Sequence, residues 1–253
     1  MSARRLRVIA RLDVKDESLV KGIQYEGLRK LGDPHDFALR YYQQGIDELV
    51  YLDTVASLYE RSNLSGILER TTRDVFIPIT AGGGVRSVED MAALLRAGAD
   101  KVAVNTAALR DPKLLTQCAQ AFGRQCVVLS VQAKRRPGGG WEAYYDNGRE
   151  HSGRDVLEWV REGTERGAGE IFLTSVDQEG FQRGMDQELI AAVTAQVDIP
   201  VIAAGGADGA RSLEMASENG ADAVALGSVL HYGKVKIPDL KQQLLEKGIE
   251  VRV

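Results

Sequence analysis

The chain alternates short, almost unbroken apolar runs with longer segments in which apolar residues recur every three or four positions. Runs such as VVLSV and AVAL are typical of strands covered on both faces, as in parallel sheets. They predict strands at 7–14, 48–53, 76–80, 101–105, 126–132, 170–175, 201–204 and 223–227. The periodic segments predict helices at 33–44, 87–97, 112–122, 155–166, 186–196 and 211–219.

Eight strands that alternate with helices predict a (β/α)8 TIM barrel, and residues 1–253 form one domain of the usual size for that fold. The helix boundaries agree with this order, since Asp33 is a suitable N-cap and Pro34 suits the first helical position. An open doubly wound sheet is the alternative, although it normally has fewer strands.

The two halves of the chain repeat each other at a constant offset. PITAGGG at 78–84 aligns with PVIAAGG at 200–206, and GAD at 98–100 aligns with GAD at 220–222, so both pairs are 122 residues apart. Glu48 and Glu170, each at the start of a predicted strand, are separated by the same number. Three matches in register predict two duplicated half-barrels of four strands. The segment KRRPGGG at 134–140 interrupts this pattern and predicts an exposed turn that returns through 141–145 as a hairpin.

Composition narrows the possible partners. The chain has 32 Lys and Arg against 36 Asp and Glu, a net charge of −4, which argues against nucleic acid binding. No apolar run approaches the roughly 18 residues of a membrane span, so we expect a cytoplasmic protein with no membrane contact. Cys118 and Cys126 fit buried apolar positions, and the three histidines lack metal-ligand spacing. We therefore expect no metal and no cofactor.

Two glycine turns follow corresponding strands and carry the clearest chemical signal. Small residues at the carboxyl end of a barrel strand let the backbone approach a phosphate. Each turn faces a neighbouring strand end with small or polar residues. The first set is Gly83, Gly84, Asn105 and Thr106, and the second is Gly205, Gly206, Gly227 and Ser228. Two such sets on opposite sides of one barrel mouth predict a bisphosphate ligand.

Asp13 is the best acid–base candidate, because burial at the end of an apolar strand can raise the pKa of a carboxyl group. A loop-capping aspartate is the plainer interpretation. Asp53 could orient Asp13 or a substrate hydroxyl, and Lys21, in the loop after the first strand, could close over a phosphate or simply be solvated. Thr174 and Asp177, with Glu179 beyond them, follow the sixth strand and are weaker candidates.

With these residues in view, the chain resembles the cyclase subunit of imidazole glycerol phosphate synthase, an enzyme of histidine biosynthesis. The resemblance covers nearly the whole chain. It rests on LDVKD (12–16), LVKG (19–22), GDP (32–34), GIDELVYLD (45–53), GGG (82–84), GADKVAVNTAA (98–108), AKR (133–135), GAGEIFLTSVD (167–177), GG (205–206) and GADA (220–223). The related isomerase of the same pathway shares the half-barrels and the glycine turns but fits fewer of these segments.

The resemblance implies a lyase that uses ammonia from a glutaminase subunit, in a heterodimer, to convert the bisphosphate PRFAR to imidazole glycerol phosphate and AICAR. By position, Asp13 matches a catalytic aspartate and Lys21 a mobile-loop lysine. Asp100 matches an aspartate at the glutaminase interface. Four further residues match the charged ring at the ammonia entrance, namely Arg7, Glu48, Lys101 and Glu170.

Three positions depart from the family pattern. Gln132 stands where the second catalytic aspartate is expected, and an amide does not exchange a proton near neutral pH. Ala10-Arg11 replaces a Pro-Cys pair and places a cation where it could obstruct ammonia or hold Asp13 ionised. Asp16-Glu17 replaces an Asp-Gly pair. Two alternatives therefore stay open. One is a paralogue that channels ammonia from a glutaminase to another amidotransferase reaction, and the other is a non-catalytic subunit that binds a phosphorylated ligand.

Overall fold

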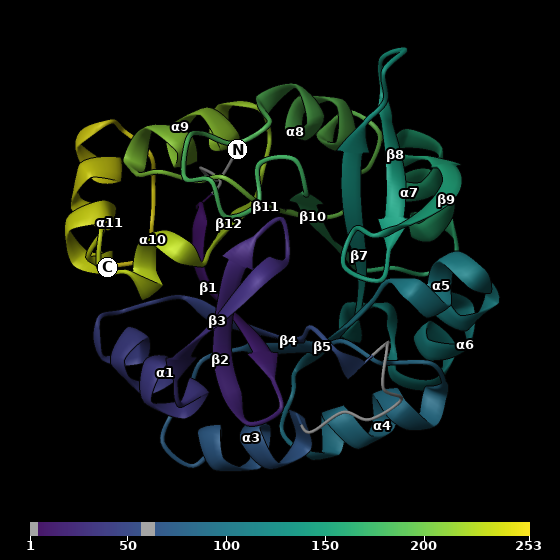
Figure 1. Ribbon diagram of the computed structural model, residues 1–253, viewed down its shortest axis with the longest axis horizontal. Coiled ribbons are helices and arrows are strands. Elements are labelled where there is room, and N and C mark those ends of the chain that lie inside the picture. The colour runs from purple at the N-terminus through teal and green to yellow at the C-terminus, as the bar shows by residue number, and fades with distance from the viewer. Residues whose placement is uncertain (1–4, 57–63) are drawn as a thin grey trace.

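The computed structural model describes residues 5–56 and 64–253 and shows a closed barrel of parallel strands surrounded by helices (Figure 1). Neighbouring barrel strands pair in parallel, and the last pairs with the first, so the barrel has no open edge. The barrel strands are β1 (Arg7–Lys15), β4 (Glu48–Asp53), β5 (Ile79–Gly82), β6 (Lys101–Val104), β7 (Val127–Arg135), β10 (Glu170–Ser175), β11 (Val201–Ala204) and β12 (Ala223–Leu226). The predicted (β/α)8 barrel is confirmed.

Successive side chains of a barrel strand point alternately outward to the helices and inward to the barrel axis, so the apolar core has two parts. In β1, Val8, Ala10 and Leu12 join the large apolar cluster between the barrel and the helices. Ile9 belongs to a separate cluster inside the barrel, together with Phe172 and residues from most other strands. The helices are α1 (Pro34–Gln43), α3 (Leu64–Thr71), α4 (Val88–Arg96), α5 (Thr106–Arg110), α6 (Lys113–Phe122), α7 (Val156–Glu165), α8 (Gln187–Thr194), α9 (Ala210–Glu218), α10 (Ser228–His231) and α11 (Ile237–Glu246). A 3-10 turn, Arg124–Cys126, precedes β7.

The six predicted helices form within two residues of their predicted ends, and Asp33 caps α1 by accepting a hydrogen bond from His35 N at 2.7 Å. The third strand was predicted wrongly at 76–80, since β5 begins at Ile79 and Phe76 is 74% exposed. Pro78 explains the shift. Proline has no N–H to donate to a sheet, so the strand starts after it, and only its carbonyl takes part, accepting from Leu49 N at 2.9 Å.

The duplication is visible in the element boundaries. Strands β4, β5 and β6 and helix α4 reappear as β10, β11, β12 and α9, with both ends of each element shifted by 122 residues. Single hydrogen bonds repeat as well. Asp100 Oδ2 accepts from Ile79 N at 2.8 Å, and Asp222 Oδ2 accepts from Val201 N at 2.8 Å. The duplication of these elements therefore extends to individual backbone hydrogen bonds.

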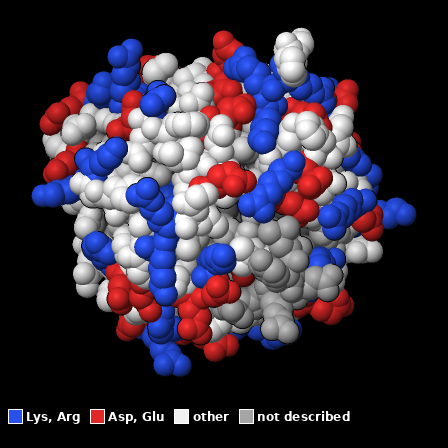
Figure 2. Space-filling view, viewed as in Figure 1, with Lys and Arg blue, Asp and Glu red and all other residues white. Residues whose placement is uncertain are grey.

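Each half carries one inserted hairpin after its first strand. The first consists of β2 (Ser18–Ile23) and β3 (Glu26–Gly32), and the second of β8 (Trp141–Tyr145) and β9 (Glu150–Asp155). The second matches the predicted return through 141–145, whereas the first was not predicted. The β2–β3 hairpin crosses the front of the barrel in Figure 1. On the face shown in Figure 2, acidic and basic side chains are intermixed.

Candidate functional site

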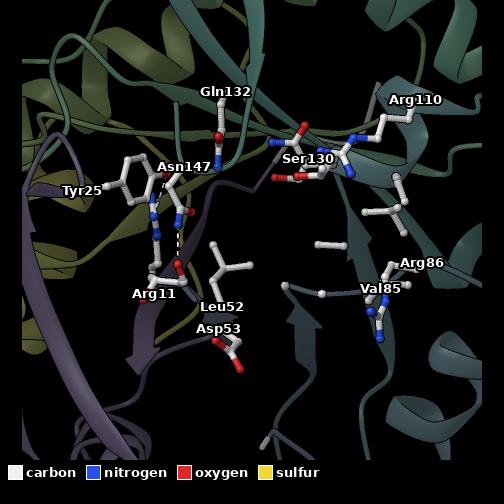
Figure 3. A pocket seen from close by; sticks show the side chains of 18 of the residues that line it. Arg11, Tyr25, Leu52, Asp53, Val85, Arg86, Arg110, Ser130, Gln132 and Asn147 are labelled. Carbon is white, nitrogen blue, oxygen red and sulfur yellow. Dashed lines mark hydrogen bonds between the residues drawn. The ribbon is translucent and has the colours of Figure 1, made fainter. Parts of the chain in front are cut away.

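A cavity of about 320 Å³ lies at the carboxyl ends of β4, β5 and β6, as expected for a barrel active site (Figure 3). Six predicted site residues line it, namely Asp53, Gly83, Gly84, Asn105, Thr106 and Gln132. Sequence reasoning missed several others in the lining, including Tyr25, Arg86, Arg110, Ser130 and Asn147. Figure 3 shows Tyr25, Arg11 and Asn147 on one side of the cavity, with Arg86 and Arg110 on the other.

The glycine turns are required by backbone packing as well as suited to a ligand. Gly83 has φ +99°, and a Cβ there would lie 2.3 Å from the carbonyl oxygen of Asp53. Gly205 has φ +97°, and a Cβ there would lie 2.5 Å from the carbonyl oxygen of Ser175. Both residues of the second contact are 122 positions after those of the first. Glycine at these positions therefore has a structural cause that is independent of any phosphate.

The second turn opens on a much smaller cavity of about 20 Å³, which has room for about one water molecule. The predicted residues that line it are Lys21, Gly205, Gly206, Gly227 and Ser228. Arg11 and Glu179 also line it. The two turns are thus related in sequence but differ in the space that they leave for a ligand.

A buried network of ion pairs lies inside the barrel between the two cavities, and its Arg11 lines both of them. Arg11 Nε donates to Asp13 Oδ1 at 2.8 Å, and Lys21 Nζ donates to Asp13 Oδ2 at 2.8 Å. Arg11 also donates to Glu179 at 3.2 Å and to the Tyr25 hydroxyl at 2.9 Å, while Lys21 forms a second ion pair with Glu179. All five side chains are buried. Two cations and two carboxylates balance each other inside a low-dielectric interior.

The network corrects the expectation for Asp13. Burial by itself raises the pKa of this carboxyl, but the charges of Arg11 and Lys21 outweigh it and lower the pKa from 3.8 to about 2. Asp13 is therefore ionised at neutral pH. It can accept a proton but holds none to donate. Arg11 therefore helps to keep Asp13 ionised, which is one of the two effects expected of a cation at this position.

Lys21 and Glu179 also differ from the sequence expectation. Lys21 lies on strand β2 rather than in an open loop, only 3% of its surface is exposed, and two carboxylates bind its ammonium group. Glu179, weighed only as a weak candidate, is buried and contacts both cations of the network. The β2–β3 hairpin is held against this turn, since Gln24 N donates to the Glu179 carbonyl at 2.9 Å.

The side-chain carbonyl of Gln132 is hydrogen-bonded to the second hairpin, β8–β9. Its Oε1 accepts a hydrogen bond from Gly148 N at 2.7 Å. The hairpin tip places three consecutive residues at positive φ, with Asp146 at +49°, Asn147 at +58° and Gly148 at +71°. Asn147 donates from its amide to the Thr54 carbonyl across the mouth. Gln132 therefore fixes a hairpin that forms part of the cavity wall.

Three further predicted residues have local structural roles. Asp53 Oδ1 accepts from Val55 N and Ala56 N at 3.0 and 2.9 Å and so caps the turn after β4. Asp177 accepts from Arg135 N at 2.8 Å and lines neither cavity. Thr174 is buried beside Gln132 in the β10–β7 register and also lines neither cavity, and its hydroxyl has no hydrogen-bond partner within 5–56 and 64–253.

At the opposite end of the barrel, the four predicted ring residues form a closed cycle of ion pairs. Arg7 contacts Glu48 at 2.7 Å and Glu170 at 2.6 Å, and Lys101 contacts the same two carboxylates at 3.1 and 2.7 Å. Burial of Glu48 opposes ionisation, but Arg7 and Lys101 lower its pKa below the usual range. Each residue starts a barrel strand, so the ring closes the end away from the cavities.

Comparison with known proteins agrees with this architecture. Residues 7–236 match the histidine biosynthesis protein family. The chain belongs to this family. It is similar to proteins named imidazole glycerol phosphate synthase subunit HisF. The Legionella pneumophila protein is 59% identical over 201 residues, covering 79% of this chain and 95% of the relative. The Streptococcus sanguinis protein is 48% identical over 248 residues, 98% of each chain, and the Mycobacteroides abscessus protein is 49% identical over 252 residues, 97% and 98% of the two chains.

Proposed function

We propose that this chain is a cyclase-type lyase that uses ammonia from a glutaminase subunit and acts on the bisphosphate PRFAR, giving imidazole glycerol phosphate and AICAR. The observation that carries the proposal is the duplicated pair of glycine turns at one barrel mouth, the first of which lines a cavity of about 320 Å³. The histidine biosynthesis family and the names of its HisF members support it.

The two residues at the expected catalytic positions, Asp13 and Gln132, differ in whether they can exchange a proton. Asp13 is ionised, but it lines neither cavity and both of its carboxylate oxygens are paired, so it can receive a proton from a bound intermediate only when the ion network opens. Gln132, at the far side of the cavity lining, offers hydrogen bonds but no titratable proton. Losing one general acid or base typically costs about 10²- to 10⁴-fold in rate. We therefore expect slow turnover from the unmodified protein.

The test measures PRFAR turnover with an ammonium salt, so that no partner is required. Gln132→Asp should raise the rate markedly, and Asp13→Asn should abolish what remains. Because Arg11 lowers the pKa of Asp13, the double change Gln132→Asp, Arg11→Cys is the fairer comparison. If the unmodified protein turns over PRFAR at an ordinary enzymatic rate, the argument from Gln132 is wrong.

One observation favours a second candidate. The buried network of Arg11, Asp13, Lys21 and Glu179 occupies the barrel where ammonia would reach the mouth. Such a chain could partner a glutaminase yet deliver ammonia to a different amidotransferase reaction, or bind a phosphorylated ligand without turnover. If the double variant binds PRFAR and stays inactive, this second candidate becomes the better one.

The glutaminase partner has its own test, for which the duplication supplies a matched control. Asp100 and Asp222 each accept a backbone N–H at 2.8 Å, and Asp222 has a further contact, so Asp222→Ala should cost at least as much stability as Asp100→Ala. Only Asp100→Ala should weaken co-purification with a glutaminase encoded nearby. Equal weakening by both variants would assign the effect to stability rather than to an interface.

A further inference from the structure

One wall of the 320 Å³ cavity contains two side-chain amides, those of Gln132 and Asn147. Gln132 comes from β7, and Asn147 comes from the tip of the β8–β9 hairpin. The two residues are neighbours in space, because Gly148 N, next in sequence to Asn147, donates to Gln132 Oε1 at 2.7 Å. Figure 3 shows both amides on the side of the cavity away from Arg86.

Each amide has one orientation that suits its backbone partner. A backbone N–H can only donate, so the Gln132 carbonyl faces Gly148 and the Gln132 NH2 group faces away from it. A backbone carbonyl can only accept, so the Asn147 NH2 group faces the Thr54 carbonyl and Asn147 Oδ1 faces away. The ends that remain are a hydrogen-bond donor on Gln132 and a hydrogen-bond acceptor on Asn147.

Both remaining ends are open to a ligand. Neither Gln132 Nε2 nor Asn147 Oδ1 has a hydrogen-bond partner within the part of the chain that the structure describes, and neither is among its fully buried polar atoms. The hairpin tip is held by its own backbone conformation and by the contacts with Gln132 and Thr54. The two amides are therefore already in place before a ligand binds, which lowers the entropy cost of binding.

A donor beside an acceptor limits the chemical groups that can bind. A carboxylate would be repelled by the Asn147 oxygen, and an ammonium group would be repelled by the Gln132 NH2 group. A carboxamide carries a carbonyl and an NH2 group on one carbon, so it can satisfy both ends. Arg11, the cation on the same side of the cavity, is already paired with Asp13 and Glu179.

We propose that Gln132 and Asn147 form a binding site for a carboxamide, in which Gln132 donates to the carboxamide oxygen and Asn147 accepts from its NH2 group. Gln132 is then a specificity-determining residue. The inference rests on the proposed function, in which PRFAR and AICAR both carry a carboxamide, and it places that end of the ligand against β7 and the β8–β9 hairpin.

The experiment compares two ligands by isothermal titration calorimetry on the full chain. One ligand is AICAR, and the other is the same ribotide without its carboxamide. The unmodified protein should bind AICAR about tenfold more tightly or better, because the shorter ligand loses two hydrogen bonds and leaves both amide ends unpaired. The ratio of the two affinities is the readout, since the phosphate and the ribose contribute to both ligands alike.

Gln132→Glu tests the donor. Glutamate keeps the length of the side chain and the acceptor for Gly148 N–H, but it replaces the NH2 group by an oxygen. The affinity ratio should fall several-fold, because a carboxamide can then satisfy only one of the two residues. Gln120→Glu is the matched control: it adds the same charge at an exposed position on α6 and should leave the ratio unchanged.

Asn147→Gly tests the acceptor. Glycine tolerates the positive φ of +58° and removes the side-chain oxygen, so the ratio should fall here as well. Binding of the ribotide without the carboxamide checks that both variants are folded. Equal affinity of the unmodified protein for the two ligands, binding of neither ligand, or an unchanged ratio in both variants would overturn the carboxamide site.

The outcomes separate this inference from the proposed function. Preference for AICAR without any PRFAR turnover would support the carboxamide site and count against the lyase reaction. Turnover of PRFAR with equal affinity for the two ribotides would support the reaction and overturn the site. If both hold, Gln132→Asp should raise the KM for PRFAR even where it raises kcat, because aspartate supplies a titratable group but removes the donor.

Discussion

Asp13 shows how single residues in this barrel are set by their neighbours. An isolated buried carboxyl would be hard to ionise, yet two adjacent cations lower its pKa to about 2. The same two cations are shared with Glu179, so no residue of the network can be replaced without changing the others. The charge of each residue in the network is therefore set by all of its members together.

This gives a prediction for acid stability. The folded pKa of Asp13 lies below its ordinary value of 3.8, so its ion pairs stabilise the fold fully above that value, and the contribution is lost as pH falls toward 2. A carboxyl group whose pKa is lowered in this way contributes on the order of 2 kcal/mol of stability at neutral pH. Asp13→Asn should therefore lower the free energy of unfolding most at neutral pH and least near pH 2, as measured by urea denaturation.

The exposed Asp16 provides the control for that measurement. Asp16→Asn should leave the pH dependence unchanged, because the residue is outside the network and asparagine tolerates its positive φ of +56°. A stability difference between Asp13→Asn and the unmodified protein that is the same at every pH would contradict the ion-pair explanation.

At the scale of elements, the β8–β9 hairpin and the β2–β3 hairpin convert an ordinary barrel mouth into a partly covered one. The β8–β9 hairpin brings Asn147 into the cavity and is fixed by Gln132, and the β2–β3 hairpin brings Lys21 and Tyr25 into the network. Both follow the first strand of a half-barrel. The residues that distinguish this site thus come largely from the inserted hairpins.

Two glycines of the second hairpin test how strongly its tip is held. Gly148 and Gly153 have nearly the same φ, +71° and +72°. A Cβ at Gly148 would lie 2.8 Å from Val176 Cγ1, whereas none of the described atoms comes within 4 Å of a Cβ at Gly153. Gly148→Ala should therefore destabilise the protein by about 2–3 kcal/mol and Gly153→Ala by about 1 kcal/mol, measured by urea unfolding.

Hydrogen exchange over 141–155 supplies a second readout, because Gly148→Ala should also release the Gly148–Gln132 contact and lower protection at the tip. Equal cost for the two alanine variants would mean that the contact with Val176 adjusts freely and that the tip is not fixed.

At the scale of the whole molecule, the ion-pair ring joins the two half-barrels at their strand starts. Glu48 and Glu170 occupy equivalent positions, and each contacts both Arg7 and Lys101. Glu48→Gln and Glu170→Gln should therefore destabilise the fold by similar amounts, about 2–4 kcal/mol each, since a buried pair that loses one partner leaves uncompensated charge. Thermal or urea unfolding would check this, and a large difference between the two would show that the ring is not symmetric in energy.

The sequence predicted the repeating part of this molecule and the return strand of the β8–β9 hairpin, but it did not predict the β2–β3 hairpin. The barrel strands are buried on both faces and separated by regular helices, so periodicity was enough to place them, apart from the shift caused by Pro78. The β2–β3 hairpin was missed because its turn uses Gln24 and Tyr25 at positive φ rather than glycine or asparagine. Arg110 and Asn147 were missed because periodicity does not show which surface loops meet at the mouth.

Charged and apolar layers alternate along the inside of the barrel, with the ring at one end, Ile9 and Phe172 in the middle, and Arg11 with its partners at the other end. This order places an apolar layer between two charged ones. An ammonium ion would leave water for an apolar layer at a cost of many kcal/mol, whereas neutral ammonia keeps no charge to desolvate. If ammonia follows this path, as the proposed function requires, turnover driven by a glutaminase should rise with pH as more of the ammonia is neutral.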